Sequence, residues 1–334
     1  MPIKYKKLIS MISIICIVAS LTGCTKKSTP ITRTEFYFDT VITITIFDSS
    51  KESLLDEAFS ICEQYENMFS KTIKDSEVSM LNTRGQSNSA PPDFQDIIKT
   101  SIFYSKLTNG AFDITIAPLS SLWNFTDTSP VIPEKEDIAN ALTRVGYENI
   151  SIDGEKVFLL DNASIDLGGI AKGYIADKLK EFFLSKDVKS AVINLGGNIL
   201  EIGNKPNGQP YLVGIQYPFE QSGKTIATVK TFDKSVVTSG CYERYFELNE
   251  QIYHHILDPK TGYPVNNELL SVTIISDDST LGDCLSTACY VLGYEDSVKL
   301  LDSLPDVEGI FVDKDFALHL TDGLILKDNV ISLK

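Results

Sequence analysis

The chain has 334 residues, of which 43% are apolar, including 17 Phe and 14 Tyr. This length provides one large domain or two ordinary ones, and the apolar content excludes global disorder. The formal charge of −15 predicts a surface that repels nucleic acid and anionic lipid, so any phosphate ligand must be met by local backbone dipoles or by a cation.

The first 24 residues have the pattern of a targeting segment. Lys4, Lys6 and Lys7 precede a short apolar run, and the sequence LTGC ends this run at Cys24. The pattern resembles a bacterial lipoprotein signal, in which the cysteine is acylated and becomes the mature N-terminus. A plain cleaved signal and a single anchor helix are the alternatives.

The lipoprotein interpretation places the rest of the chain outside the cytoplasmic membrane. Residues 25–33 are then a tether and residues 34–334 the folded domain, held at the cell membrane by a lipid on Cys24. Loss of the three leader lysines lowers the formal charge to −18. We therefore expect an extracytoplasmic, lipid-anchored protein that does not bind nucleic acid.

Hydrophobic periodicity predicts helices and short strands that are mixed along the chain without a regular β-α alternation. The expected helices lie within 55–69, 91–110, 133–145, 174–183 and 279–293. The expected strands cover 40–47, 157–160, 191–194, 212–216, 226–231, 244–248, 271–275 and 309–312, with another near the C-terminus. This mixture favours an α+β fold, as one compact unit of one or two lobes, over a doubly wound parallel sheet.

Four cysteines remain after the leader: Cys62, Cys241, Cys284 and Cys289. None of them forms a C-x-x-C pair, so their spacing indicates neither a zinc site nor a dithiol motif. We expect ordinary buried thiols.

The stretch DLGGIAKGYIAD (166–177) places two adjacent glycines and Lys172 at the start of a predicted helix. Glycine permits close approach to the backbone, and a helix N-terminus favours anions. The stretch is not a phosphate-binding P-loop, because Lys172 is followed by Gly173 and Tyr174 rather than by Ser or Thr. On its own it is equally compatible with an ordinary strand-to-helix turn.

The stretch STLGDCLSTACYVLG (279–293) predicts an amphipathic helix. Asp283, Ser286 and Thr287 fall on the face opposite the leucines, because residues four apart are neighbours on a helix. A carboxylate and a hydroxyl one turn apart offer two hard oxygen ligands of the kind that Mg²⁺ prefers. On spacing alone, a solvated polar face is the commoner explanation.

Two of the three histidines lie in YHHILDPKTGYPV (253–265), directly before the strong turn sequence DPKTG. Histidine at the edge of a loop lies where functional groups are common. His254 or His255 could act as an acid or base, or could hydrogen-bond to nearby backbone.

Together with others, these stretches resemble the ApbE family, the FAD:protein FMN transferases, from about Thr34 to the C-terminus. The matching stretches, in chain order, are 37–44, 69–82, 108–125, 166–177, 191–199, 236–246, 255–265 and 282–293. The resemblance implies one compact domain of mixed, largely antiparallel sheets with packed helices. The lipoprotein signal agrees with it, since many family members are lipoproteins.

The resemblance also implies a magnesium site and an FAD site. The metal ligands would be the Asp283 carboxylate, the Thr287 hydroxyl and a backbone carbonyl at Gly169. The FAD contacts would come from Phe38, Thr72, Ala111, Phe112, Asp113, Asp166, Lys172, His255, Ile256 and Ser286. Many relatives have a tyrosine in place of Thr72, so one stacking contact on the flavin is in doubt.

The implied reaction cleaves the diphosphate of FAD. A Thr or Ser hydroxyl of an acceptor protein attacks the FMN-side phosphorus, AMP leaves, and FMN remains joined through a phosphoester. His255 is the candidate for assisting deprotonation of the hydroxyl. The acceptor would be an extracytoplasmic or membrane flavoprotein with a Thr-containing target motif, such as a membrane electron-transfer subunit. Hydrolysis of FAD to FMN and AMP, and a lipoprotein that binds flavin without chemistry, are the alternatives.

Overall fold

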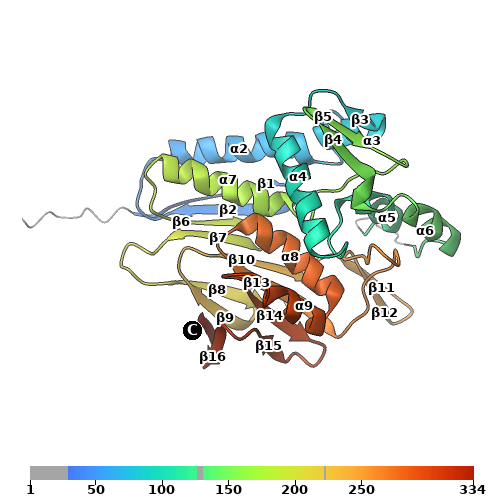
Figure 1. Ribbon diagram of the computed structural model, residues 1–334. Coiled ribbons are helices and arrows are strands. Elements are labelled where there is room, and N and C mark those ends of the chain that lie inside the picture. Colours follow the sequence, from blue (N-terminus) through green and yellow to red (C-terminus); the bar gives the residue numbers. More distant parts are fainter. Residues whose placement is uncertain (1–28, 126–130, 222) are drawn as a thin grey trace, which may run out of the picture.

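The computed structural model describes residues 29–125, 131–221 and 223–334. An eight-stranded antiparallel sheet runs through its centre in the order β1-β2-β6-β7-β10-β13-β14-β15. These strands are β1 (Ile31–Tyr37), β2 (Thr40–Ile46), β6 (Ser190–Leu195), β7 (Asn198–Gly203), β10 (Ser235–Gly240), β13 (Leu269–Ser276), β14 (Glu308–Asp313) and β15 (Leu318–Leu320). Helices cover one face of the sheet, and a smaller sheet lies on the other face (Figure 1).

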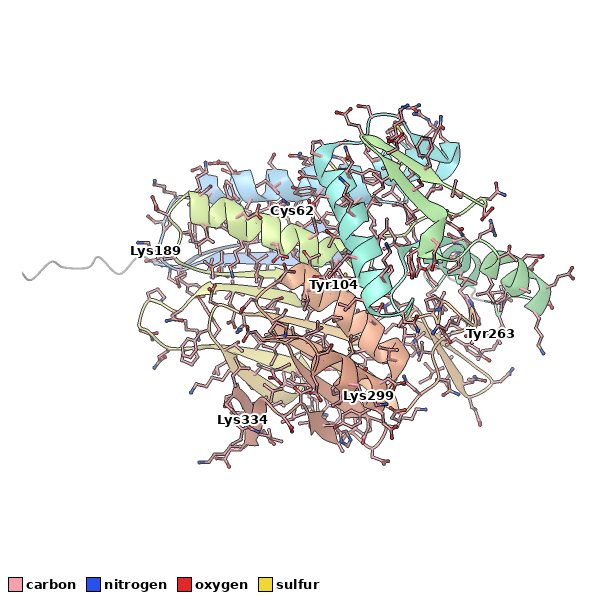
Figure 2. All side chains as sticks on the ribbon, viewed as in Figure 1. Cys62, Tyr104, Lys189, Tyr263, Lys299 and Lys334 are labelled. Atoms are coloured by element: carbon pink, nitrogen blue, oxygen red, sulfur yellow. The ribbon has the colours of Figure 1, made fainter. Side chains whose placement is uncertain are left out.

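The helical layer consists of α2, α7, α8 and α9, with α4 packed against α8. Their bounds are α2 (Ser53–Phe69), α4 (Pro92–Leu107), α7 (Ala171–Ser185), α8 (Ser279–Leu292) and α9 (Tyr294–Leu301). Figure 2 labels Cys62 on α2 and Tyr104 on α4, and both side chains are buried. This layer matters for function because α7 and α8 lie against each other on one face of the sheet.

Three smaller sheets complete the fold. The four-stranded sheet has the order β16 (Leu324–Lys327), β17 (Val330–Leu333), β9 (Thr225–Thr231) and β8 (Tyr211–Gln216), and only its β17–β9 pair is parallel among the pairs that the structure describes. The others are β3 (Gln86–Ser87), β5 (Lys156–Leu159) and β4 (Ile150–Asp153), and the hairpin of β11 (Tyr245–Leu248) and β12 (Gln251–His254). The remaining helices are α3 (Glu77–Arg84), α5 (Ala117–Trp123), α6 (Lys135–Leu142) and the 3-10 turns Ile114–Ile116 and Tyr147–Asn149.

Strand β2 shows how the alternation of residues along the sequence gives the sheet one buried and one partly exposed face. Ile42, Ile44 and Ile46 are fully buried, while Thr43 and Thr45 point the other way and pair with threonines of β1 through hydroxyl hydrogen bonds of 2.9 Å. Alternation of apolar and polar residues thus puts one face of the sheet under α2 and leaves the other partly solvated.

The predicted α+β fold with largely antiparallel sheets is confirmed, and the predicted helices and strands are all present with shifted ends. Sequence periodicity did not predict β1, α3, β3, α5, β4, β7, β10, β12, α9 and β15, and it predicted one strand near the C-terminus where β16 and β17 both lie. Strand β1 begins at Ile31, so ordered structure starts inside the segment 25–33 that was expected to be a tether. The four cysteines after the leader are buried and free, as expected.

The leader and Cys24 lie outside the described residues. Within the part of the chain that the structure describes, no helix has both the length and the apolar character that a bilayer crossing requires.

Candidate functional site

The glycine loop (166–170) lies between the 3-10 turn Ile114–Ile116 and the start of α7. The Asp166 amide donates to the Ile114 carbonyl at 2.7 Å, and Asp166 Oδ1 accepts from the Gly168 amide at 3.0 Å. Asp166 Oδ2 accepts from Lys71 Nζ at 2.6 Å and from Ser120 Oγ at 2.9 Å. Burial opposes ionisation of Asp166, but Lys71 and these hydrogen bonds outweigh it and hold the pKa of the carboxyl below its usual value. Asp166 is therefore ionised, and its hydrogen bonds hold the glycine loop in place.

Asp283 of α8 faces the other side of this loop and is almost fully buried. Its Oδ2 accepts from the Gly173 amide at 2.9 Å, and its Oδ1 lies 3.6 Å from Lys172 Nζ. Lys172 Nζ also donates to the Gly168 carbonyl at 3.2 Å. An ammonium group thus sits between a buried carboxylate and a loop carbonyl, which marks a position where positive charge is stabilised.

The polar face of α8 is not a solvated face, so that alternative is wrong. Ser286 is fully buried, donates to the Asp283 carbonyl at 3.0 Å, and lies 2.8 Å from Ser239 Oγ of β10. Ser239 Oγ is also 3.3 Å from Thr287 Oγ1. A Cβ added to Gly169 would lie 3.6 Å from that Thr287 hydroxyl, so the glycine loop lies against this face.

The donors gathered here fit a hard divalent cation. They are one buried carboxylate, the Thr287 hydroxyl and the Gly168 carbonyl, all of them oxygens. Within the described ranges, no group of three or more His, Cys, Asp and Glu side chains could hold a metal by itself. A metal at Asp283 would therefore complete its shell with water or ligand oxygens, as Mg²⁺ does at phosphate sites.

His255 follows β12 at the base of the β11–β12 hairpin. Its Nδ1 lies 3.2 Å from the Arg244 carbonyl oxygen, which can only accept, so Nδ1 carries the proton and Nε2 keeps its lone pair. Burial, and then the charges of Arg244 and other neighbours, lower the pKa of His255 to about 3. The imidazole is thus neutral at pH 7 and presents a free acceptor nitrogen.

His254 has a structural environment instead. It is buried, its Nε2 lies 2.9 Å from the Val265 carbonyl, and its ring meets Tyr290 edge-on. Burial lowers the pKa of His254 to about 4. Of the two histidines, His255 has Lys172 among the charges that lower its pKa, whereas Lys314 is the charge that acts on His254.

The expected flavin contacts divide into two groups. Phe112 is buried, and its ring would lie 3.3 Å from a Cβ on Gly169, so the buried pair Ala111 and Phe112 backs the glycine loop. Both side-chain oxygens of Asp113 accept hydrogen bonds within the protein, from the amide and hydroxyl of Thr115 and from the Tyr147 amide, at 2.6–2.8 Å. Burial raises the pKa of Asp113, and the side chain caps the 3-10 turn.

The other expected contacts lie in three different environments. Phe38 occupies the tight turn between β1 and β2 with φ 55°, and its amide donates to Glu66 Oε1 at 2.6 Å. Thr72 is exposed, 3.0 Å from Ser70 Oγ, and directly follows Lys71, which bonds Asp166. Ile256 is buried in the apolar cluster beneath α8 and α9.

Several residues at the site were not singled out from the sequence. Lys71 and Ser120 hold Asp166, and Ser239 joins the two hydroxyls of α8. All lie inside stretches matched to the family, but no local spacing signals their roles.

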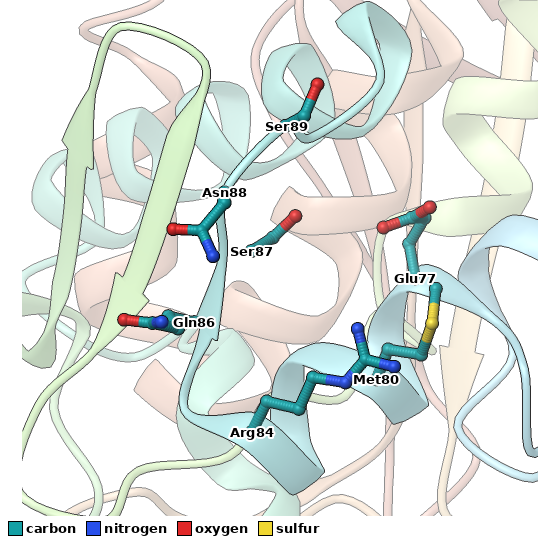
Figure 3. Close-up of a pocket in the computed structure, with 7 residues that line it drawn as sticks. All are labelled: Glu77, Met80, Arg84, Gln86, Ser87, Asn88 and Ser89. Atoms are coloured by element: carbon teal, nitrogen blue, oxygen red, sulfur yellow. The ribbon is translucent and has the colours of Figure 1, made fainter.

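A separate hollow lies away from this site. It has a volume of about 480 Å³ and is open to solvent between α3 and β3 (Figure 3). Its lining residues are Glu77, Met80, Arg84, Gln86, Ser87, Asn88 and Ser89. None of them is a predicted site residue.

Comparison with known proteins gives a consistent result. Residues 38–311 match the ApbE family. A FAD:protein FMN transferase of Treponema pallidum is 30% identical over 347 residues, covering 96% of this chain and 95% of the relative, and one of Klebsiella pneumoniae is 36% identical, covering 80% and 84%. The crystal structure of the ApbE protein from Thermotoga maritima has a TM-score of 0.80 at 32% identity, covering 88% of this chain and 97% of that one. The apo form of the Pseudomonas stutzeri flavinyl transferase ApbE has a TM-score of 0.79 at 28% identity, covering 89% and 96%.

Proposed function

Because the chain belongs to the ApbE family, we propose that it is a magnesium-dependent FAD:protein FMN transferase, attached to the outer face of the cell membrane by a lipid on Cys24. It takes FAD as substrate, joins the FMN part to a Thr or Ser hydroxyl of a partner protein, and releases AMP.

One observation carries the proposal: Lys172 and the Gly173 amide converge on the buried Asp283 carboxylate beside the glycine loop. A diphosphate needs concentrated positive charge and amide donors, and this acidic chain offers few other places for it. The start of α7 directs the positive end of its helix dipole toward the glycine loop, and the glycines leave the backbone there accessible.

Asp283, Thr287 and a glycine-loop carbonyl would hold Mg²⁺. The carbonyl that already accepts a cationic group is that of Gly168, and Gly169 lies against Thr287. When bound, the ion would neutralise charge on the diphosphate oxygens and polarise the phosphorus. Lys172 adds a second positive charge beside the same oxygens.

His255 would accept the proton of the acceptor hydroxyl at Nε2. Burial and nearby positive charges keep the ring neutral, so the Nε2 lone pair is available at neutral pH. The hydrogen bond from Nδ1 to the Arg244 carbonyl keeps the ring in the required tautomer.

The chemistry balances as a single displacement at phosphorus. The acceptor Thr oxygen forms a bond to the FMN-side phosphorus while the bond from that phosphorus to the bridging oxygen breaks. The bridging oxygen leaves with AMP, and the hydroxyl proton goes to His255. No covalent enzyme intermediate is needed, so positioning and charge neutralisation supply the catalysis.

The acceptor and the location follow from the same interpretation. The LTGC sequence ending at Cys24 supports a lipid anchor, which would keep the enzyme beside membrane-bound partners. We infer an extracytoplasmic or membrane acceptor with a Thr-containing target motif, such as a membrane electron-transfer subunit.

The test is to incubate the purified protein with FAD and Mg²⁺, with and without a candidate acceptor. A matched acceptor has its target Thr replaced by Ala, and a second control contains EDTA. Release of AMP only with the intact acceptor, together with a gain of the mass of FMN on it, supports the transferase. AMP and free FMN without acceptor indicate a hydrolase, whereas intact bound FAD indicates a carrier.

A further inference from the structure

Asp177, the last residue of the stretch 166–177, connects α7 to α8. Its carboxylate accepts from the amides of Ser279 and Thr280 at 3.0 and 2.8 Å and from the Thr280 hydroxyl at 2.6 Å. These groups belong to the first turn of α8, whose amides have no partners within their own helix. A side chain of one helix therefore caps the start of another.

Asp278 already caps α8 from within the same segment. Its side chain accepts from the Leu281 amide at 2.7 Å, as an ordinary N-cap does. The second carboxylate carries an energetic penalty, because burial and the charge of Asp278 raise the pKa of Asp177 to about 7. Local capping alone does not account for placing two carboxylates at one helix start.

A second contact lies one turn away along both helices. The Gly173 amide donates to Asp283 Oδ2 at 2.9 Å, and a Cβ on Gly173 would lie only 2.7 Å from the Ser279 carbonyl carbon and 2.8 Å from Thr280 Cα. Asp177 follows Gly173 by four residues, and Asp283 follows Ser279 by four, so each helix contributes one residue to each contact on a single face. The two contacts run in antiparallel order, with Gly173 opposite Asp283 and Asp177 opposite Ser279. Together they fix the position of α8 along the axis of α7.

We propose that Asp177 is a positioning residue, which sets the separation between Asp283 and the glycine loop by docking the first turn of α8 on α7. Without its carboxylate, the buried amides of Ser279 and Thr280 lose their acceptor, and the links described between α7 and α8 are reduced to the Gly173 hydrogen bond and the Lys172 ion pair, both to Asp283. Asp283 then no longer lies at a defined distance from the loop carbonyls. The inference deepens the proposed metal and diphosphate site and rests on it for its consequence in binding.

The first measurement uses Mg²⁺ alone, without flavin. Thermal unfolding of the full protein is followed over a range of MgCl₂ concentrations, since an ion that binds only the folded state raises the midpoint. We expect Asp177→Ala to raise the half-saturating Mg²⁺ concentration about tenfold or more, and Asp177→Asn, which keeps one acceptor oxygen, to raise it by less.

Asp278→Ala is the matched control. It removes a cap of the same kind from the same helix end, but it breaks no bond to α7. It should lower the melting temperature in the absence of Mg²⁺ while leaving the half-saturating concentration within about twofold of the parent. Equal shifts in the Asp177 and Asp278 variants would overturn the proposal, because loss of stability would then explain both.

Amide hydrogen exchange at Gly173 tests the positioning without any metal. We expect exchange of this amide to accelerate about tenfold or more in Asp177→Asn and to change little in Asp278→Ala. Only the Asp177 variant weakens the hydrogen bond from the Gly173 amide to Asp283. If the parent protein gains no stability from Mg²⁺ but this pattern of exchange holds, the positioning stands and the proposed metal site fails. Unchanged exchange at Gly173 in Asp177→Asn overturns the positioning itself.

Discussion

Replacing Gly173 by Ala tests the closeness of α7 and α8 directly. The added Cβ would lie 2.7–2.8 Å from backbone carbons of Ser279 and Thr280, and backbone cannot rotate out of the way as a side chain can. Carbon atoms prefer separations of about 3.5–4.0 Å, so the helices must part by about 1 Å. That movement would lengthen the hydrogen bond from the Gly173 amide to Asp283 and the bonds made by Asp177.

The expected loss of stability follows from three contributions. Overpacking costs about 1–3 kcal/mol, and a buried amide that loses a carboxylate partner costs about 1.5–3 kcal/mol. The better helix propensity of Ala returns about 1 kcal/mol. We therefore expect a destabilisation of about 2–5 kcal/mol, which corresponds to a fall in melting temperature of roughly 5–15 °C for a domain of this size.

The assay is thermal unfolding with and without Mg²⁺, and Gly282→Ala is the control. Gly282 also lies within a helix, but a Cβ there would meet only side-chain atoms, the nearest being a Val237 methyl at 3.0 Å. That variant should stay within about 1 kcal/mol of the parent. If Gly173→Ala is as stable as Gly282→Ala and responds to Mg²⁺ like the parent, the reasoning about helix contact is refuted.

Three further predictions concern single side chains. Asp283→Asn keeps an acceptor for the Gly173 amide but removes the negative charge, so metal-dependent AMP release should fall at least about 100-fold. Circular dichroism should show that the variant is still folded. Full activity would contradict the metal assignment. His255→Gln should lower the initial rate of flavin transfer at pH 7 about 10²- to 10⁴-fold. Fluorescence titration should show a nearly unchanged affinity for FAD. An unaltered rate would exclude His255 as the base. Glu201 is fully buried, and burial raises its pKa to about 7, so its ionised form destabilises the folded state as the pH rises from about 4.5 through 7. Glu201→Gln should therefore gain stability over the parent between pH 5 and pH 8, by up to about 3 kcal/mol in urea unfolding, and a constant difference across that range would show that Glu201 does not titrate in this way.

The local patterns predicted much of the fold. Alternation in TVITITI predicted β2, and helical spacing predicted α2 and α8, because each of these elements has one apolar face of the right period. The periodicity did not predict the short helix α3, nor the strand β10, because Ser235–Gly240 has no strict alternation. Burial of β10 between two neighbouring strands makes it a strand without a periodic signal.

The candidate site was predicted only in part. Family resemblance indicated Asp166, Lys172 and Asp283, but it did not indicate that Lys71 pairs with Asp166 or that Ser239 joins the α8 hydroxyls. The partner of Asp166 lies 95 residues earlier in the chain, so no local pattern records the pair.

By itself the sequence determined the types of secondary structure, the positions of the glycines and the chemical character of the groups near them, since these depend on preferences within a few residues. Only the tertiary structure decided that the polar face of α8 is buried, that His255 keeps its Nε2 lone pair, and that Gly173 meets Asp283 from 110 residues away. The physical reason is that a hydrogen bond between distant segments depends on how two helices pack on a common sheet. That packing is set by the whole core and not by the residues that make the bond.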